Sequence, residues 1–435
     1  MRLLVLSDAF PPHNLGGAGE VADLVSRRLA EMGHEVLVVT GVRRRGQAGA
    51  ERQGKLTVRR IWAPVPAALR LHLGLLHPLA VAQVRQIAAA FRPDAVHAHN
   101  VHERLSFAAL GAARTGGAPL ALTAHDYLLF CLTKFLCSRG DVDYTATPAA
   151  CPHCRHIRRA PGRNTVVRRI VQRHVSAIAC ISHAQRTALA ANGFAGAPLE
   201  VIYNGIDPAE CETTTEEEQA FRDRYGLDRR PLVLFGGRIS GAKGGDQLVR
   251  AVAHARRRVD LQLVILGDRP AYFAHARRLA EAVGLPPDAL HPLGWLDGDA
   301  LRRAFGAAHL CATPSVYPDP FNLMTLRAMA HGKPVVGTCY GATPELVVDG
   351  ETGFIADPWQ PEGFGERLAD LALDPTLAGR LGAAGRQRVA AAFTLDRQAQ
   401  AYAAFFARLR PGAAADGCAE FARRTAGNHD PSWSA

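Results

Sequence analysis

One stretch, residues 315–336, constrains the fold more than any other part of the chain. An apolar run at residues 309–313 precedes it and predicts the end of a buried strand. Pro318 and Pro320 keep the next residues extended, and Asn322 is a favourable N-cap for a helix. Apolar residues then repeat at helical spacing, until a glycine and a proline end the helix and two valines open another strand.

The predicted product is a strand, a tight loop and a helix whose first N–H groups face the space above a sheet. The positive end of the helix dipole and its free N–H groups suit an anion such as a diphosphate. An ordinary strand–helix turn of an α/β domain has the same pattern, so both interpretations stay open on this stretch alone.

The same order of elements begins each half of the chain. The strand Arg2–Ser7 is followed by Gly16-Gly17 and a helix, and the strand Pro231–Phe235 is followed by a glycine-rich loop that carries Arg238 and Lys243. Glycines let a backbone approach a ligand closely ahead of a helix. We therefore expect an α/β fold of two Rossmann-like domains that face each other across a cleft.

Residues 319–336 resemble the signature of the retaining glycosyltransferases of family 4, which have the two-domain GT-B architecture. In that signature an acidic residue, Pro, Phe, a small residue and Leu precede Glu-Ala-Met-Ala-x-Gly-x-Pro-Val-Val. The two acidic positions lie eight residues apart, and Asp319 and Arg327 occupy them here. In the family the first carboxylate binds donor-sugar hydroxyls and the second holds the ribose. Asp319 keeps its charge on a shorter arm, whereas Arg327 reverses the charge, so the ribose contact is not carried over.

Other motifs match the same family. The Pro-Pro-x-x-x-Gly-Gly loop ending at Gly17 resembles the loop that lies over the donor diphosphate, and Gly-Arg-x4-Lys-Gly with Arg238 and Lys243 resembles the motif that grips it. His125 resembles the family's active-site histidine. Glu345 ends a Gly-rich loop and would hold the ribose in place of residue 327, or it simply starts a helix. Two fixed cations would stabilise a departing nucleoside diphosphate without a metal.

The resemblance implies a retaining transfer of a hexosyl unit from a nucleotide-diphosphate sugar, with a UDP-sugar favoured, to an acceptor hydroxyl. A nucleotide-sugar epimerase and a non-catalytic nucleotide-sugar-binding protein are the alternatives. No cofactor is expected to be required for catalysis. The expected catalytic residues are His125, Asp319, Arg238 and Lys243. The expected residues for the donor diphosphate and nucleotide are Gly16, Gly17, Arg238, Lys243, Asn322, Leu323, Arg327 and Glu345.

Four of the nine cysteines gather within 24 residues: Cys131, Cys137, Cys151 and Cys154. Four thiolates could hold a structural zinc ion, and reduced cysteines that pack a loop are the alternative. His97, His99, His102 and His125 also raise the question of a metal site. Because they lie on separate segments, the first three are better explained as core or loop histidines.

The net charge of +11 is unevenly spread, because residues 127–175 hold nine Lys or Arg against two Asp. Such a segment would attract a phosphorylated acceptor or an anionic membrane face, and a solvated basic face without a partner is the alternative. Nucleic acid is an unlikely partner because no aromatic residues are interleaved for base stacking.

The expected organisation follows from these motifs. An acceptor-binding domain covers residues 1–205 with a Cys/Arg-rich insert at 127–175, a linker covers 206–230, and a donor-binding domain covers 231–395. A crossing helix covers 396–410 and a flexible tail 411–435. Gly41 to Gly54 is expected to be a polar, mobile connection. The short apolar start is no signal peptide, and no run spans a bilayer, so we expect a cytoplasmic protein, with the inner membrane face as an alternative location.

Overall fold

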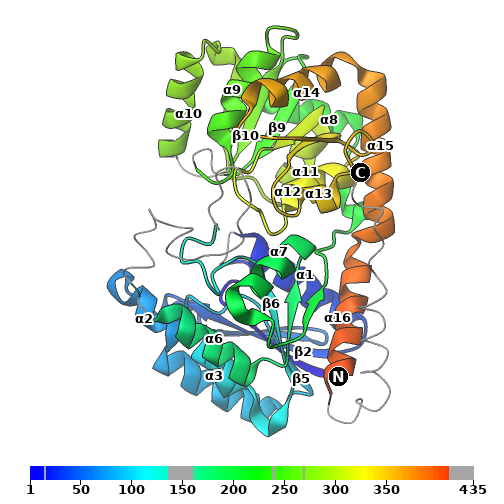
Figure 1. Cartoon of the computed structure of the whole chain (residues 1–435). Coiled ribbons are helices and arrows are strands. Elements are labelled where there is room, and N and C mark those ends of the chain that lie inside the picture. The colour runs from blue at the N-terminus through cyan, green and yellow to red at the C-terminus, as the bar shows by residue number, and fades with distance from the viewer. Residues whose placement is uncertain (14–15, 136–159, 161, 238–240, 268–269, 411–435) are drawn as a thin grey trace.

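The computed structural model describes residues 1–13, 16–135, 160, 162–237, 241–267 and 270–410, and it has two α/β lobes (Figure 1). Each lobe is built on its own mainly parallel sheet with helices packed against it. The expected fold class, two Rossmann-like domains, is therefore confirmed. Arg238, Cys137, Cys151 and Cys154, most of the insert at 127–175 and the tail from 411 lie outside the described residues.

The first lobe contains a sheet of eight strands in the order β3-β4-β2-β1-β5-β6-β7-β8. Its central strand β1 is buried along almost its whole length, as the continuous apolar run Leu3–Leu6 requires. The strands are β1 (Arg2–Ser7), β2 (Glu35–Val42), β3 (Gly49–Gln53), β4 (Leu56–Trp62), β5 (Ala95–Ala98), β6 (Leu120–Ala124), β7 (Ala177–Cys180) and β8 (Leu199–Val201). The helices are α1 (Gly17–Glu31), α2 (Arg70–Leu75), α3 (Pro78–Phe91), α4 (Ala108–Ala113), α6 (Arg163–His174) and α7 (His183–Leu189).

The expectation of an irregular connection from Gly41 to Gly54 is wrong. This stretch contains β3, which pairs antiparallel with β4 at the edge of the sheet. All five residues of β3 are exposed, so no alternation of apolar and polar residues marks it in the sequence. Its backbone hydrogen bonds to β4 make it a strand.

The second lobe contains a six-stranded parallel sheet in the order β11-β10-β9-β12-β13-β14. The strands are β9 (Leu232–Gly236), β10 (Gln262–Leu266), β11 (Leu290–Gly294), β12 (Leu310–Thr313), β13 (Val335–Thr338) and β14 (Phe354–Ala356). The helices are α8 (Thr215–Tyr225), α9 (Gly245–Ala255), α10 (Pro270–Ala282), α11 (Gly298–Ala307), α12 (Leu323–Ala330), α13 (Thr343–Leu346), α14 (Pro361–Leu373) and α15 (Pro375–Ala392).

The last described helix, α16 (Leu395–Leu409), returns the chain to the first lobe along one side of the molecule (Figure 1). Its aromatic residues Tyr402, Phe405 and Phe406 belong to the core that α1 and β1 also build. The Tyr402 hydroxyl lies 2.9 Å from Oγ1 of Thr123 on β6. The two lobes are therefore joined by packing as well as by the chain.

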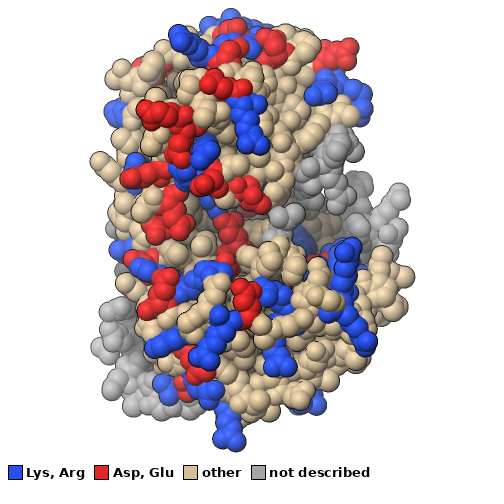
Figure 2. Space-filling view, turned by 180° about the vertical axis from the view of Figure 1, so that it is seen from behind, with Lys and Arg blue, Asp and Glu red and all other residues tan. Residues whose placement is uncertain are grey.

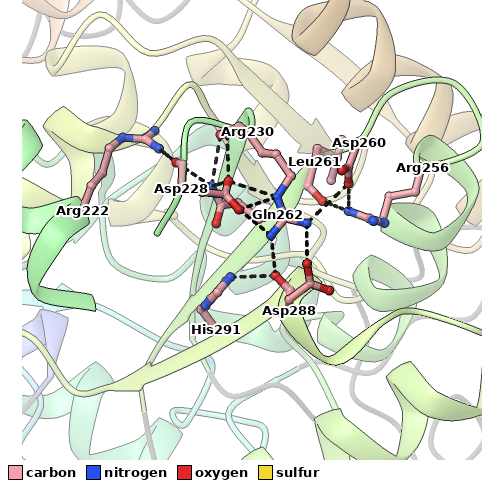
Figure 3. Close-up of polar contacts among 9 residues, drawn as sticks. All are labelled: Arg222, Asp228, Arg230, Arg256, Asp260, Leu261, Gln262, Asp288 and His291. Carbon is pink, nitrogen blue, oxygen red and sulfur yellow. Dashed lines mark hydrogen bonds and ion pairs between the residues drawn. The ribbon is translucent and has the colours of Figure 1, made fainter. Parts of the chain in front are cut away.

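A network of charged residues closes the amino-terminal edge of the second sheet (Figure 3). Arg230 pairs with Asp228 at 2.7 Å and with Asp288 at 2.9 Å. The fully buried Gln262 donates its amide to the Asp228 and Arg230 carbonyl oxygens at 3.1 Å each. Ligands of parallel sheets bind at the carboxyl ends of the strands, which is the opposite edge. We therefore assign this network to stability.

Candidate active site

Three helix starts come together between the lobes. A Cβ atom on Gly17, at the start of α1, would lie 2.7 Å from Leu323 Cδ1 at the start of α12. Gly244, the N-cap of α9, has a φ of 73° and passes so close to the Pro314 carbonyl that no side chain would fit. The starts of α1, α9 and α12 thus lie close together, and each helix start carries the positive end of its dipole.

The helix start at α12 is fixed by its cap, as the sequence predicts. The Asn322 side chain accepts hydrogen bonds from the backbone N–H groups of Met324 at 3.0 Å and Thr325 at 3.3 Å. Its amide group lies 3.4 Å from Oδ2 of Asp319. Asn322 therefore sets both the direction of the helix and the position of the signature carboxylate.

Lys243 and Asp319 form an ion pair at this place. The Lys243 ammonium donates to Asp319 Oδ2 at 2.5 Å, and Asp319 is 3% exposed. Ser315 also donates to the same oxygen at 3.3 Å. The Lys243 ammonium lies 5.5 Å from the centre of the Tyr317 ring, within range of a cation–π contact. Two residues that the sequence places 76 positions apart are thus brought together.

The loop that carries Asp319 is held by both lobes. The hydroxyl of Tyr127, which lies just after β6 in the first lobe, donates to the Pro318 carbonyl at 2.7 Å. Tyr317 belongs to the buried core cluster of the first lobe although it is part of the second. The signature loop is therefore positioned by long-range contacts as well as by its two prolines.

His125 lies at the carboxyl end of β6, where a parallel sheet places ligand-binding groups. Its Nε2 lies 2.7 Å from His99 Nδ1, and the two rings stack with centroids 5.0 Å apart. Burial lowers the pKa of His125 to about 4. Near neutral pH its ring is therefore a neutral hydrogen-bonding group. Beside it is a small cavity, lined by His99, Asn100, His102, Thr123 and Asp126 among others.

Within the described part of the chain, no group of three or more His, Cys, Asp or Glu side chains could hold a metal ion. His97 and His99 are core residues, as expected for histidines on separate segments. Cys131 is a buried, free thiol 3.1 Å from the Thr133 hydroxyl. Since its three expected partners are not among the described residues, the zinc interpretation stays a prediction.

Arg327 and Glu20 join the lobes through an ion pair that the sequence did not predict. Arg327 lies on α12 and Glu20 in the first turn of α1. Burial lowers the pKa of Arg327, so its charge needs a nearby carboxylate. The charge reversal at position 327 was the signal for an acidic partner, but the sequence separation of 307 residues hid which acid it is.

Glu345 also contacts the other lobe. Its carboxylate accepts hydrogen bonds from the backbone N–H groups of His183 at 2.9 Å and Ala184 at 2.8 Å, which are the first two residues of α7. The Tyr203 hydroxyl donates to it at 2.8 Å. A contact with a ribose would require Glu345 to give up some of these bonds, so the structure favours a role in joining the lobes.

Exchanging the charges of the Glu20–Arg327 pair tests this interlobe contact. Glu20→Arg and Arg327→Glu should each lower the free energy of unfolding, because like charges then face each other. The double exchange should recover most of the loss, with a coupling energy of about 1–3 kcal/mol in a double-mutant cycle. Chemical unfolding of all four proteins measures this. Strictly additive losses would show that the pair does not join the lobes.

Two α/β lobes with a lysine–carboxylate pair beside the helix starts match the arrangement expected of a glycosyltransferase of the GT-B fold. A family model described as "Glycosyltransferase Family 4" matches residues 15–210, and one described as "Glycosyl transferases group 1" matches residues 230–374. The protein belongs to glycosyltransferase family 4.

Named relatives agree with this assignment. A GDP-mannose-dependent alpha-(1-6)-phosphatidylinositol monomannoside mannosyltransferase of Mycolicibacterium smegmatis is 30% identical over 52% of this chain and 60% of its own length. The protein of the same name from Mycobacterium tuberculosis is 30% identical over 66% of this chain and 73% of its own length. An alpha-maltose-1-phosphate synthase of Mycolicibacterium smegmatis is 35% identical over 44% of this chain and 51% of its own length.

Solved structures share the fold. Sucrose-phosphate synthase of Thermosynechococcus elongatus superposes with a TM-score of 0.74 at 20% identity, and covers 94% of this chain and 99% of its own. Anabaena HepE in complex with UDP and glucose superposes with a TM-score of 0.71 at 21% identity, with the same coverage. At this identity the likeness concerns the fold alone.

Proposed function

We propose that the protein transfers a hexosyl unit from a nucleotide-diphosphate sugar to an acceptor hydroxyl, with retention of configuration at the anomeric carbon. The observation that carries the proposal is the Lys243–Asp319 pair at the meeting point of three helix starts. An ammonium has three donors, and Asp319 accepts one of them. Lys243 can therefore also bind the donor phosphates, whose negative charge grows as the glycosidic bond breaks.

The remaining residues take positioning roles in this proposal. Asp319 would accept hydrogen bonds from hydroxyls of the donor sugar, because Asn322 and Ser315 hold its carboxylate in one place. His125, neutral and on the facing lobe, would contact the sugar near the acceptor. Arg238 would add a second cation for the diphosphate. Closure of the lobes around these groups would exclude water and favour transfer over hydrolysis.

GDP-mannose is the first donor to test. The family resemblance favours a UDP-sugar, whereas the named mycobacterial relatives are GDP-mannose-dependent. A nucleotide sugar present at about a hundred times its Kd should raise the free energy of unfolding by about 2.7 kcal/mol. Thermal unfolding with GDP, UDP and ADP and their sugars therefore ranks the candidates.

A turnover assay then separates the classes of function. A transferase releases nucleoside diphosphate in proportion to a supplied acceptor, such as a phosphatidylinositol mannoside. An epimerase converts the donor with no acceptor present, and a binding protein changes neither. Stabilisation by a nucleotide sugar without turnover on any acceptor, or conversion of donor alone, would contradict the proposal.

A further inference from the structure

The first lobe exposes a group of leucines on one short segment. Leu69, Leu71, Leu76 and Leu79 are 50%, 44%, 54% and 50% exposed, and we call them the leucine surface. Together they account for four of the nine large hydrophobic residues that are exposed in the described part of the chain. Exposed apolar side chains that gather in one place mark interaction sites more often than isolated ones do.

The leucine surface is not needed for the core of the lobe. The buried side of α3 is made by Ala80, Val84, Ile87, Ala88 and Phe91. α2 packs closely against the rest of the lobe at Gly74, where a Cβ atom would lie 2.5 Å from the His102 carbonyl oxygen. The Gly74 carbonyl in turn accepts from the Phe107 N–H at 3.0 Å. Both helices are thus held on their inner sides, and the leucines are left on the outer side.

The charge around the leucine surface is mainly positive, with Glu103 paired to Arg70 at 3.3 Å as an acidic residue beside it. Between Glu51 and Asp94 the sequence contains seven Lys or Arg and no Asp or Glu, and Arg70 and Arg85 are exposed within or beside α2 and α3. α4 contacts both α3 and α6, and neither α4 nor α6 contains an acidic residue. α6 adds the basic residues Arg168, Arg169 and Arg173, whereas its Arg163 is buried.

These elements form one side of the molecule. Figure 1 shows α2, α3 and α6 together on the first lobe, away from α16. Figure 2, seen from behind, shows Lys and Arg among uncharged atoms on the right side of the lower lobe, with acidic residues gathered mainly to the left. Exposed leucines and arginines therefore share this side of the lobe.

An anionic lipid surface is complementary to both features. Leucines enter the boundary between headgroups and acyl chains, while arginines stay with the negative headgroups. Among the described residues no single helix is long and apolar enough to cross a membrane, whereas the pair Ala67–Leu75 and Pro78–Phe91, bent by about 40°, qualifies by length and composition alone. The inner face of α3, however, is committed to the protein core, so this segment can lie on a membrane but cannot span it.

We propose that the leucine surface and its flanking arginines dock the first lobe on an anionic lipid bilayer. This docking surface differs from the basic segment 127–175, because α2 and α3 supply an apolar contact in addition to charge. Docking would bring the first lobe next to a lipid-borne acceptor. It is tested by binding alone and does not depend on the proposed transfer reaction.

Flotation of the full-length protein with vesicles tests the docking. The protein should float with vesicles of phosphatidylcholine and phosphatidylglycerol, and much less with phosphatidylcholine alone. Leu71→Ser combined with Leu76→Ser should weaken binding to anionic vesicles about tenfold, because each leucine still has half of its surface to bury. The matched control is Leu373→Ser, a 50% exposed leucine at the end of α14 in the second lobe, and it should bind as wild type.

The charge component has its own pair of variants. Arg85→Glu on α3 should weaken binding several-fold and reduce its salt dependence, because about 1 kcal/mol of attraction per basic residue, roughly fivefold in binding, is lost. Arg250→Glu on α9, an exposed arginine of the second lobe, is the control and should have no effect.

Three results would overturn the docking proposal. The first is a wild-type protein that does not bind anionic vesicles, and the second is a double-serine variant that binds them as tightly as wild type. A third is a dimer, seen by light scattering without vesicles and lost in the double-serine variant, together with no vesicle binding. That result would make the leucine surface a contact between copies of this chain.

Discussion

Replacing Lys243 by alanine should reduce sugar transfer by at least about a hundredfold, since removal of one fixed donor to a developing negative charge typically costs 10²–10³ in kcat. Lys243 directly precedes Gly244, the N-cap of α9, and its Nζ lies 2.5 Å from the signature carboxylate of Asp319. The loss should appear in kcat with a good donor, because the charge on the leaving diphosphate is largest in the transition state. Steady-state kinetics with the donor found by thermal unfolding measure it.

A loss of activity in Lys243→Ala must be distinguished from a loss of folding. The variant leaves Asp319, which is 3% exposed, without its cation. A second variant, Lys243→Ala with Asp319→Asn, removes the unpaired charge and should regain stability without regaining activity. Lys55→Ala is the matched control, because Lys55 is an exposed lysine that contacts only a backbone carbonyl at 3.1 Å among its described hydrogen bonds. Transfer at the wild-type rate by folded Lys243→Ala would refute the assignment.

The sequence predicts the local parts of this site well. Pro318, Pro320 and Asn322 act within a few residues of one another, and the structure shows the extended loop and capped helix that they require. The glycines at 17 and 244 can also be recognised from the sequence, because a glycine permits close approach at a helix start, but the groups that approach, Leu323 and Pro314, are distant in the chain. Position along repeated strand–loop–helix units then places these loops at the carboxyl ends of the two sheets.

Contacts between the lobes could not be predicted in the same way. Glu20 and Arg327 are 307 positions apart in the sequence. Glu345 is 162 positions from His183, the first residue of α7. No local pattern specifies which of many acids meets a given arginine. The leucine surface is hidden for a related reason, because apolar residues in a helical stretch predict burial, and only the packed fold shows that Leu76 and Leu79 face outward.

Acidification should destabilise the first lobe, because His97 and His99 are buried in its core, 1% and 0% exposed. Burial, with repulsion from His125, lowers the pKa of His97 to about 3, and burial lowers that of His99 well below 6.5. His97 Nδ1 and His99 Nε2 have no hydrogen-bond partner among the described residues, so an added proton would find no acceptor. The unfolded chain takes up these protons near pH 6.5, whereas the folded chain does not.

The stability from these histidines is therefore complete above pH 6.5 and falls below it, by about 1.4 kcal/mol per pH unit for each ring. Asp8 acts in the opposite direction, because burial raises its pKa to about 6. In the folded protein Asp8 takes up a proton below about pH 6, whereas in the unfolded chain it does so only near its ordinary pKa of 3.8. Asp8 therefore offsets part of the loss from the histidines below about pH 6.

Urea unfolding at a series of pH values measures how the free energy of unfolding changes with pH. One variant then tests whether His97 causes part of that change. His97→Gln keeps a hydrogen-bond donor for Thr123, which now lies 2.8 Å from His97 Nε2, but it cannot take up a proton. Its free energy of unfolding should fall less steeply with acid, by about 1.4 kcal/mol per pH unit. His72→Gln, an exposed histidine on α2, should leave the slope unchanged. An identical slope in wild type and His97→Gln would show that His97 is protonated in the folded protein, because then it would contribute no difference in proton uptake.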